Sequence, residues 1–179
     1  MTLTSEKHRA ELERFSELLS KQAYQTQVTP AAGEVTYDAL LVRIESFEKE
    51  NRVWILELSF LPGLEDDLDE VSILQCYVAL SEHPAEENLT GLASLMIKLN
   101  AKLPIGSFGL LDKPRVVFFK HNALLPNDDP AASDRIVHEL VPLTSYLLRS
   151  FSDPLVKIAT GAITAEAALA AMPFGDVIG

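Results

Sequence analysis

The sequence is poor in cysteine and in long apolar runs. Its only cysteine is Cys76, which excludes an intramolecular disulfide. No stretch approaches the roughly 18 consecutive apolar residues that a membrane-spanning helix needs. The N-terminal residues MTLTSEKHRAEL contain no apolar run of the signal-peptide type. We therefore expect a cytoplasmic protein.

Positive charge is also scarce. The 179 residues include 15 Lys and Arg against 26 Asp and Glu, which gives a net charge of −11. This balance disfavours a nucleic-acid backbone or an anionic membrane surface as the main partner, and it favours contact with basic segments. A chain of this length can bury one hydrophobic core without covalent cross-links.

Apolar periodicity predicts helices at the start, in the middle and near the end of the chain. Leu12, Phe15 and Leu19 recur at helical spacing, and a second stripe follows Pro84 to Asn88. The third helix should begin at Asp129-Pro130, an N-cap followed by proline. Pro142 within it should bend or restart the helix. Residues 26–36 are expected to form a loop.

Alternating apolar residues predict strands between these helices. The expected strands are residues 39–47, 52–61 and 71–80, a short strand around Phe108, and residues 115–120. The connections within the first three are of hairpin length, which favours an antiparallel sheet. The sequence thus predicts an α+β fold in the order α-β-β-β-α-β-β-α, followed by a short C-terminal helical tail.

The alternation also predicts apolar residues on a second sheet face, opposite the face on which the main helices stack. Trp54, Leu56, Leu58 and Phe60 should face the core, whereas the opposite side carries other apolar side chains. These candidate partner-binding residues are Val53, Ile55, Ile73 and Tyr77. Either a partner covers them, or a tail helix at residues 164–172 does.

The middle helix carries a second apolar edge away from its main stripe. Ala93, Ile97 and Asn100 lie on or beside this edge. Such an edge indicates contact with something beyond the domain's own sheet.

The segment LPIGSF at residues 103–108, followed by the return strand VVFF at residues 116–119, resembles the YbjN-like family of the type III secretion chaperone-like fold. The similarity in element order covers about residues 3–152, so residues 153–179 are expected to be a separate helical appendage. The resemblance implies a small, acidic, dimeric protein whose dimer helix corresponds to residues 89–103. We therefore expect Ala93, Ile97 and Asn100 to form a dimer interface. It carries over no catalytic residues.

Residues that could carry chemistry occur without the usual motifs. The acidic loop could bind calcium, but it lacks the EF-hand spacing, so a solvated loop is the preferred interpretation; its carboxylates are Glu65, Asp66, Asp67, Asp69 and Glu70. The histidines at positions 8, 83, 121 and 138 show no metal-binding spacing. Cys76 alternates with apolar residues, which is typical of a buried side chain. No catalytic residue, metal or cofactor is predicted.

These observations favour a non-enzymatic protein-interaction module, chaperone-like or regulatory, that binds a protein or peptide client on an apolar groove. We expect it to be a homodimer. The alternative is a small-molecule-binding domain or enzyme that uses a pocket between the sheet and the helices. A third possibility is a regulatory subunit of a larger assembly.

Overall fold

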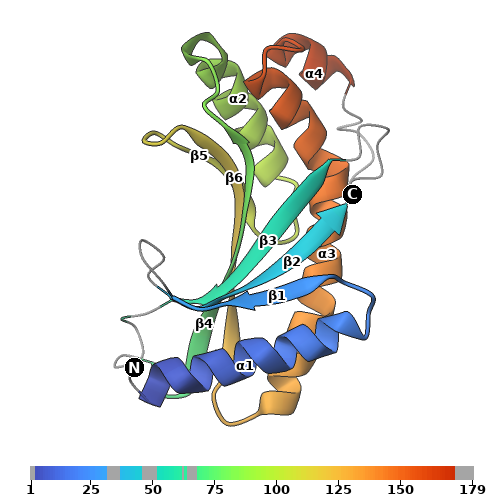
Figure 1. The fold of residues 1–179 in the computed structure, drawn as a ribbon. Coiled ribbons are helices and arrows are strands. Elements are labelled where there is room, and N and C mark those ends of the chain that lie inside the picture. The colour runs from blue at the N-terminus through green and yellow to red at the C-terminus, as the bar shows by residue number, and fades with distance from the viewer. Residues whose placement is uncertain (1–2, 32–36, 46–51, 62, 64–67, 172–179) are drawn as a thin grey trace. The chain divides into compact units, whose positions relative to one another are not determined.

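The computed structural model describes residues 3–31, 37–45, 52–61, 63 and 68–171. Its elements are α1 (Leu3–Ser20), β1 (Thr26–Thr29), β2 (Ala39–Glu45), β3 (Val53–Phe60), β4 (Val71–Glu82), the 3-10 turn η1 (Glu86–Asn88), α2 (Leu89–Asn100), β5 (Ser107–Leu111), β6 (Val116–Pro126), α3 (Pro130–Ala159) and α4 (Ala165–Ala171) (Figure 1). The strands form a six-stranded antiparallel sheet in the order β1-β2-β3-β4-β6-β5. The predicted α+β class with an antiparallel sheet is confirmed.

One strand was not predicted. Residues 26–29 belong to β1, which pairs with β2 through Val28 opposite Leu40, so the prediction of a loop from residue 26 was wrong. A strand of four residues is too short to show a clear apolar alternation by itself. Its conformation depends on the hydrogen bonds that β2 offers. Within the described ranges, four strands precede α2, whereas three were predicted.

Helix α3 also differs from the expectation. It extends over 30 residues from Pro130 to Ala159 and includes Pro142 and Pro154, so the helix does not restart at Pro142. Proline removes the N–H that would bond to the carbonyl four residues earlier, here that of His138. The Gln22 side-chain amide donates a hydrogen bond of 3.5 Å to this carbonyl. The predicted boundary after residue 152 lies inside α3.

The chain is divided into two compact units. The first comprises residues 1–77 and 122–145, and the second comprises residues 78–121 and 146–179. Strands β4 and β6 and helix α3 each contribute residues to both units. The predicted division at residue 152 falls within the second unit.

In the first unit, α1 packs against one face of β1, β2 and β3 (Figure 1). The fully buried side chains here include Leu12, Phe15 and Leu19 from α1, and Leu40, Val42, Ile44, Leu56 and Leu58 from the strands. Phe60 stacks on His8 with a centroid separation of 4.2 Å. The predicted apolar face of β3 is therefore the face that packs against helices.

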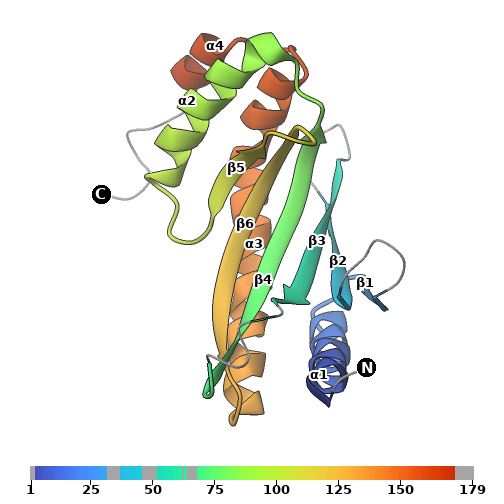
Figure 2. The same ribbon diagram turned by 90° about the vertical axis from the view of Figure 1, so that its left-hand side faces the viewer.

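The second unit combines α2, the β5–β6 hairpin, the end of α3 and α4. Helix α2 contacts β5 through a face that includes buried Leu92, Leu95 and Leu99. Helix α4 lies beside α2 in both ribbon views (Figure 2). A Cβ added to Gly91 would lie 2.7 Å from the Cβ of Ala165, so the small residue at position 91 allows this close approach.

Candidate binding surface

The face of β2 and β3 that points away from α1 is the candidate functional surface. Thr26 marks the opposite side, because its hydroxyl contacts Ser16 at 2.8 Å and Ser20 at 3.1 Å on α1. Side chains alternate along a strand, so its neighbours face away from α1. We call the following residues of the first unit the open face: Gln25, Gln27, Leu41, Arg43, Glu45, Val53, Ile55, Glu57, Ile73 and Tyr77.

Strand register brings these residues into rows across the sheet. Arg43 pairs with Ile55, and its N–H donates to the Gln25 carbonyl at 2.9 Å. In the next row, Leu41 pairs with Glu57, and Glu57 pairs with Tyr77. The open face therefore alternates apolar and polar side chains from β1 to β4.

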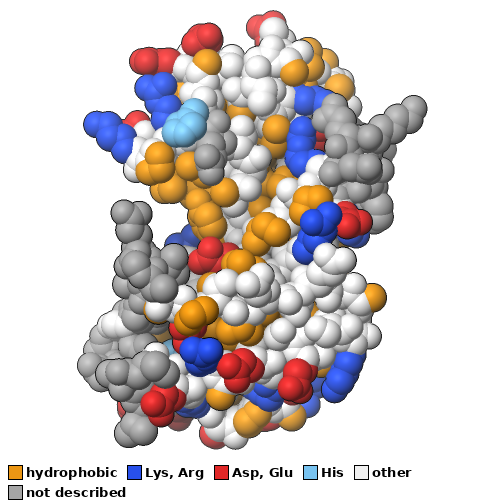
Figure 3. All heavy atoms as spheres, viewed as in Figure 1, with side chains coloured by type: hydrophobic (Ala, Val, Ile, Leu, Met, Phe, Trp, Pro, Cys, Tyr) orange, Lys and Arg blue, Asp and Glu red, His pale blue; other side chains and the backbone are white. Residues whose placement is uncertain are grey.

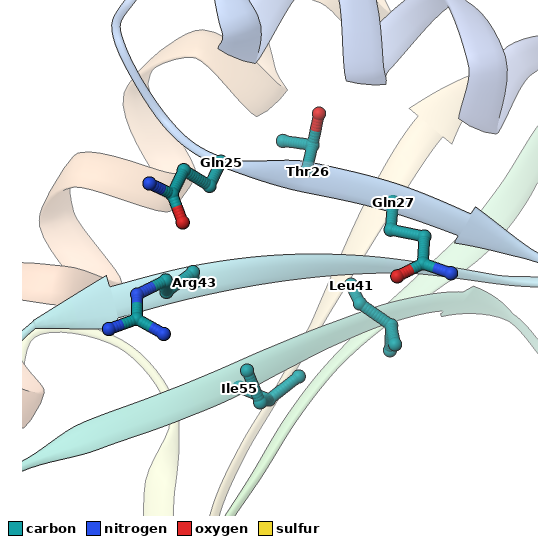
Figure 4. Close-up of a pocket in the computed structure, with 6 residues that line it drawn as sticks. All are labelled: Gln25, Thr26, Gln27, Leu41, Arg43 and Ile55. Carbon is teal, nitrogen blue, oxygen red and sulfur yellow. The ribbon is translucent and has the colours of Figure 1, made fainter.

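An open hollow of about 290 Å³ lies over β1, β2 and β3. Its lining residues are Gln25, Thr26, Gln27, Leu41, Arg43 and Ile55 (Figure 4). Figure 4 shows the Gln25 and Arg43 side chains close together at one end, whereas Thr26 projects from the other side of the strand. The Arg43 Nε donates to a Glu45 carboxylate oxygen at 3.2 Å. The hollow thus offers amide, guanidinium and aliphatic groups.

All four predicted partner-binding residues lie on the open face and are accessible. Ile55 is 47% exposed, and Val53, Ile73 and Tyr77 are partly exposed. In the space-filling view, hydrophobic side chains reach the surface in several places beside charged ones (Figure 3). The helix expected to cover them corresponds to α4, whose described contacts are with α2.

The open face has a boundary at one end. Ala39 and Ser59 point to the same side of the sheet as Ile55, yet they are 3% and 0% exposed. The Ser59 hydroxyl is buried and has no hydrogen-bond partner among the described residues. The accessible part of the face is therefore centred on Ile55 and Glu57.

Glu57 is the unusual polar residue of the open face. Its side chain is half-buried, and no hydrogen bond or ion pair involves it within the part of the chain that the structure describes. Burial raises the pKa of this carboxyl group from its usual value of 4.5. Partial burial of a carboxylate without a cation beside it costs free energy. The environment of Glu57 therefore favours protonation of the carboxyl group or the approach of a cation.

Sequence reasoning missed Gln25, Gln27, Leu41, Arg43 and Glu57 as members of this surface. The alternation of residues 39–47 placed Leu41 and Arg43 together on one side of a strand, which was a usable signal. Gln25 and Gln27 could not be found, because β1 was not predicted. The same alternation along residues 52–61 puts Glu57 on the strand face of Val53 and Ile55, but nothing in the sequence distinguishes it from a solvated glutamate.

The proposed dimer-interface residues divide into two groups. Ala93 is exposed and Ile97 is 72% exposed on α2, so both are available to a partner. Asn100 is partly buried, and its side chain forms hydrogen bonds within the second unit. Its side chain donates to the Phe108 carbonyl and accepts from the Phe108 N–H, both at 2.8 Å.

The cysteine, the possible metal ligands and the acidic loop were the remaining candidates for chemistry. Cys76 is fully buried, and burial raises the pKa of its thiol to about 12. Among the described residues, no three His, Cys, Asp or Glu side chains are grouped so that they could hold a metal ion. Asp69 and Glu70 of the acidic loop are exposed, while its Glu65, Asp66 and Asp67 lie outside the described residues.

Two glycines of the segment GSFG, residues 106–109, accommodate phenylalanine rings. A Cβ at Gly106 would overlap the ring of Phe119, and a Cβ at Gly109 would overlap the ring of Phe118. Gly106 also has a φ of +66°, which favours glycine. These contacts give the two glycines a packing role in the β5–β6 hairpin.

No helix within the described ranges is both long and apolar enough to span a bilayer. A scan of protein-family models and a search of curated proteins found no match to the chain. The function must therefore be inferred from the residues of the open face and of α2.

Proposed function

We propose that this protein is a non-enzymatic interaction module that holds a segment of a partner protein on its open face. The observation that carries the proposal is the 47% exposure of Ile55 in the middle of a sheet face whose other side packs against α1. Leu41, Val53 and Tyr77 surround it with further apolar area. Burial of such area stabilises association by about 25 cal/mol per Å² before the costs of ordering.

The proposal places the protein among chaperone-like or regulatory proteins of the cytoplasm. It includes a secretion chaperone-like fold of the YbjN-like type. The LPIGSF segment, the long closing helix and the net charge of −11 support this assignment. A role as a regulatory subunit uses the same surface and differs only in whether the partner is folded when it binds.

We further propose that the protein is a homodimer through the exposed edge of α2. Ile97 is 72% exposed, and the exposed Ala93 beside it leaves room for a second helix. Sedimentation at tens of micromolar should give a dimer for the wild type and a monomer for Ile97→Glu. A wild-type monomer at these concentrations would refute the dimer without affecting the open face.

A small-molecule site is the second candidate, because the hollow of about 290 Å³ combines Arg43 with Gln25 and Gln27 around Leu41 and Ile55. Ligand sites usually enclose roughly 300–1,000 Å³ and cover most of the ligand. An open hollow at the lower end of this range suits a side chain of a partner better than a whole metabolite.

The test is binding of a permanently unfolded model protein, dye-labelled and reduced α-lactalbumin, measured by fluorescence anisotropy. Ile55→Asp should weaken binding at least about tenfold, because it places a charge in the apolar centre. The matched control is Leu111→Asp, which changes a side chain of similar exposure, 42%, on β5. Circular dichroism checks that both variants are folded.

The proposal fails if Ile55→Asp binds as the wild type does. It also fails if Leu111→Asp weakens binding by the same factor, because the loss would then reflect the added negative charge and not its position on the open face.

A further inference from the structure

The open face offers a partner side chains but no backbone hydrogen bonds. Leu41 is paired with Gln27 on one side and Glu57 on the other, and Glu57 is paired with Leu41 and Tyr77. The peptide groups in the middle of the face are therefore used within the sheet. A segment lying over this face must satisfy its own N–H and C=O groups, which a helix does and an isolated extended segment does not.

The width of the face fits one helix. Adjacent strands lie about 4.8 Å apart, so β1 to β4 span roughly 14 Å, and a helix with its side chains is about 10 Å across. An extended segment could instead pair with the outer edge of β1, which is an end strand of the sheet in the described part of the chain. It would then lie two strand spacings beyond β2, or roughly 10 Å, too far away to cover Ile55 and Glu57.

The charges of the face specify the helix further. Arg43 and Glu45 form an ion pair at 3.2 Å and compensate one another. Glu57 has no such partner within the described residues, and Leu41 and Tyr77 flank it in the same row. A Lys or Arg side chain could lay its aliphatic stem on Leu41 or Ile55 and bring its charge to the carboxylate.

We propose that the natural occupant of the open face is an amphipathic helix that carries a Lys or Arg within its apolar stripe, with Glu57 as the acceptor for that cation. This inference rests on the function proposed above, because it assumes that the open face binds a protein segment. The net charge of −11 would add a general attraction for such a basic segment. Glu57 supplies the local specificity.

The probes are synthetic, dye-labelled amphipathic helices of about 18 residues, built from Leu, Ala and Lys. The first peptide has a Lys in the centre of its apolar stripe, and the second has Gln there. Two further peptides repeat these sequences with a central proline that breaks the helix. Anisotropy titrations use the full chain as wild type, Glu57→Gln, Glu17→Gln and Ile55→Asp.

We expect the wild type to prefer the Lys peptide to the Gln peptide by about five- to tenfold, the usual range for a partly desolvated charge pair. Glu57→Gln should remove this preference and leave the Gln peptide unaffected. Glu17→Gln is the matched control, since it removes the same charge from an exposed position on α1 and should preserve the preference. The central proline should weaken the binding of both the Lys and the Gln peptide.

The outcomes separate the two proposals. If Glu57→Gln retains the preference for Lys, or if the proline peptides bind as tightly as the helical ones, the inference is overturned. In both cases a loss of binding in Ile55→Asp would still support the open face as the site. If Ile55→Asp binds every peptide as the wild type does, the proposed function fails together with the inference.

Discussion

The side chain of Asn100 makes two hydrogen bonds to the backbone of Phe108, each of 2.8 Å, as a residue on a neighbouring strand would. The amide donates to the Phe108 carbonyl and accepts from the Phe108 N–H. This pair of bonds joins the last residue of α2 to the start of β5. The junction between them is thus closed by a specific polar contact as well as by the turn at Pro104 and Gly106.

Asn100→Ala should lower the free energy of unfolding by about 2 kcal/mol, because it removes two hydrogen bonds and leaves the Phe108 groups unpaired. Chemical denaturation measures the change. Ser94→Ala on an exposed position of the same helix is the control and should change stability by less than about 0.5 kcal/mol. Equal stability of the two variants would contradict the structural role of Asn100.

Gly109→Ala should destabilise the chain by about 1–3 kcal/mol, because its Cβ would enter the space of the Phe118 ring directly opposite. A smaller side chain at position 118 should relieve the overlap. In a Phe118→Leu background the cost of Gly109→Ala should therefore fall, whereas Phe119→Leu should give no such relief. Thermal denaturation of the two double-mutant cycles measures the coupling, and equal couplings would refute the contact.

The difference in stability between the wild type and Glu57→Gln should depend on pH. Burial raises the pKa of Glu57 above 4.5, so the folded chain holds this proton more tightly than the unfolded chain does. The resulting stabilisation is fully present below the unfolded pKa and is lost as pH rises through the folded pKa. At neutral pH the charged carboxylate therefore costs stability, and Glu57→Gln should melt at a higher temperature than the wild type.

This difference should shrink as the pH falls through the raised pKa of Glu57 toward 4.5, because the folded chain then protonates the carboxyl group. Melting curves of both proteins across this range provide the test. Glu17→Gln controls for the loss of one negative charge. A constant difference at all pH values would show that the carboxylate is not the cause.

Cys76 should resist thiol reagents in the native chain. Its side chain is fully buried, and a thiol whose pKa is raised to about 12 is almost entirely protonated at neutral pH. Reaction with a chromogenic disulfide should be slow until denaturant unfolds the chain, and it should then be complete. Rapid labelling without denaturant would contradict the packing of β4.

Patterns confined to one element were the most predictable part of the fold. Alternation along β3 separated Trp54 and Leu56 from Val53 and Ile55, because successive side chains of any strand point to opposite faces. Helical spacing placed Ile97 outside the main stripe of α2 in the same way. The strand β1 and the continuity of α3 through Pro142 depend on partners distant in the sequence, so local patterns did not show them.

The amino-acid sequence by itself determined that Val53 and Ile55 lie on the same face of one strand and that Ile73 and Tyr77 lie on the same face of the next strand. It also determined that the chain is acidic. Only the tertiary structure decided which neighbours these residues have. It placed Arg43 beside Ile55 and Glu57 between Leu41 and Tyr77, and it paired Asn100 with Phe108. The physical reason is that alternation belongs to a single strand, whereas cross-strand neighbours and helix-to-strand hydrogen bonds depend on register and packing.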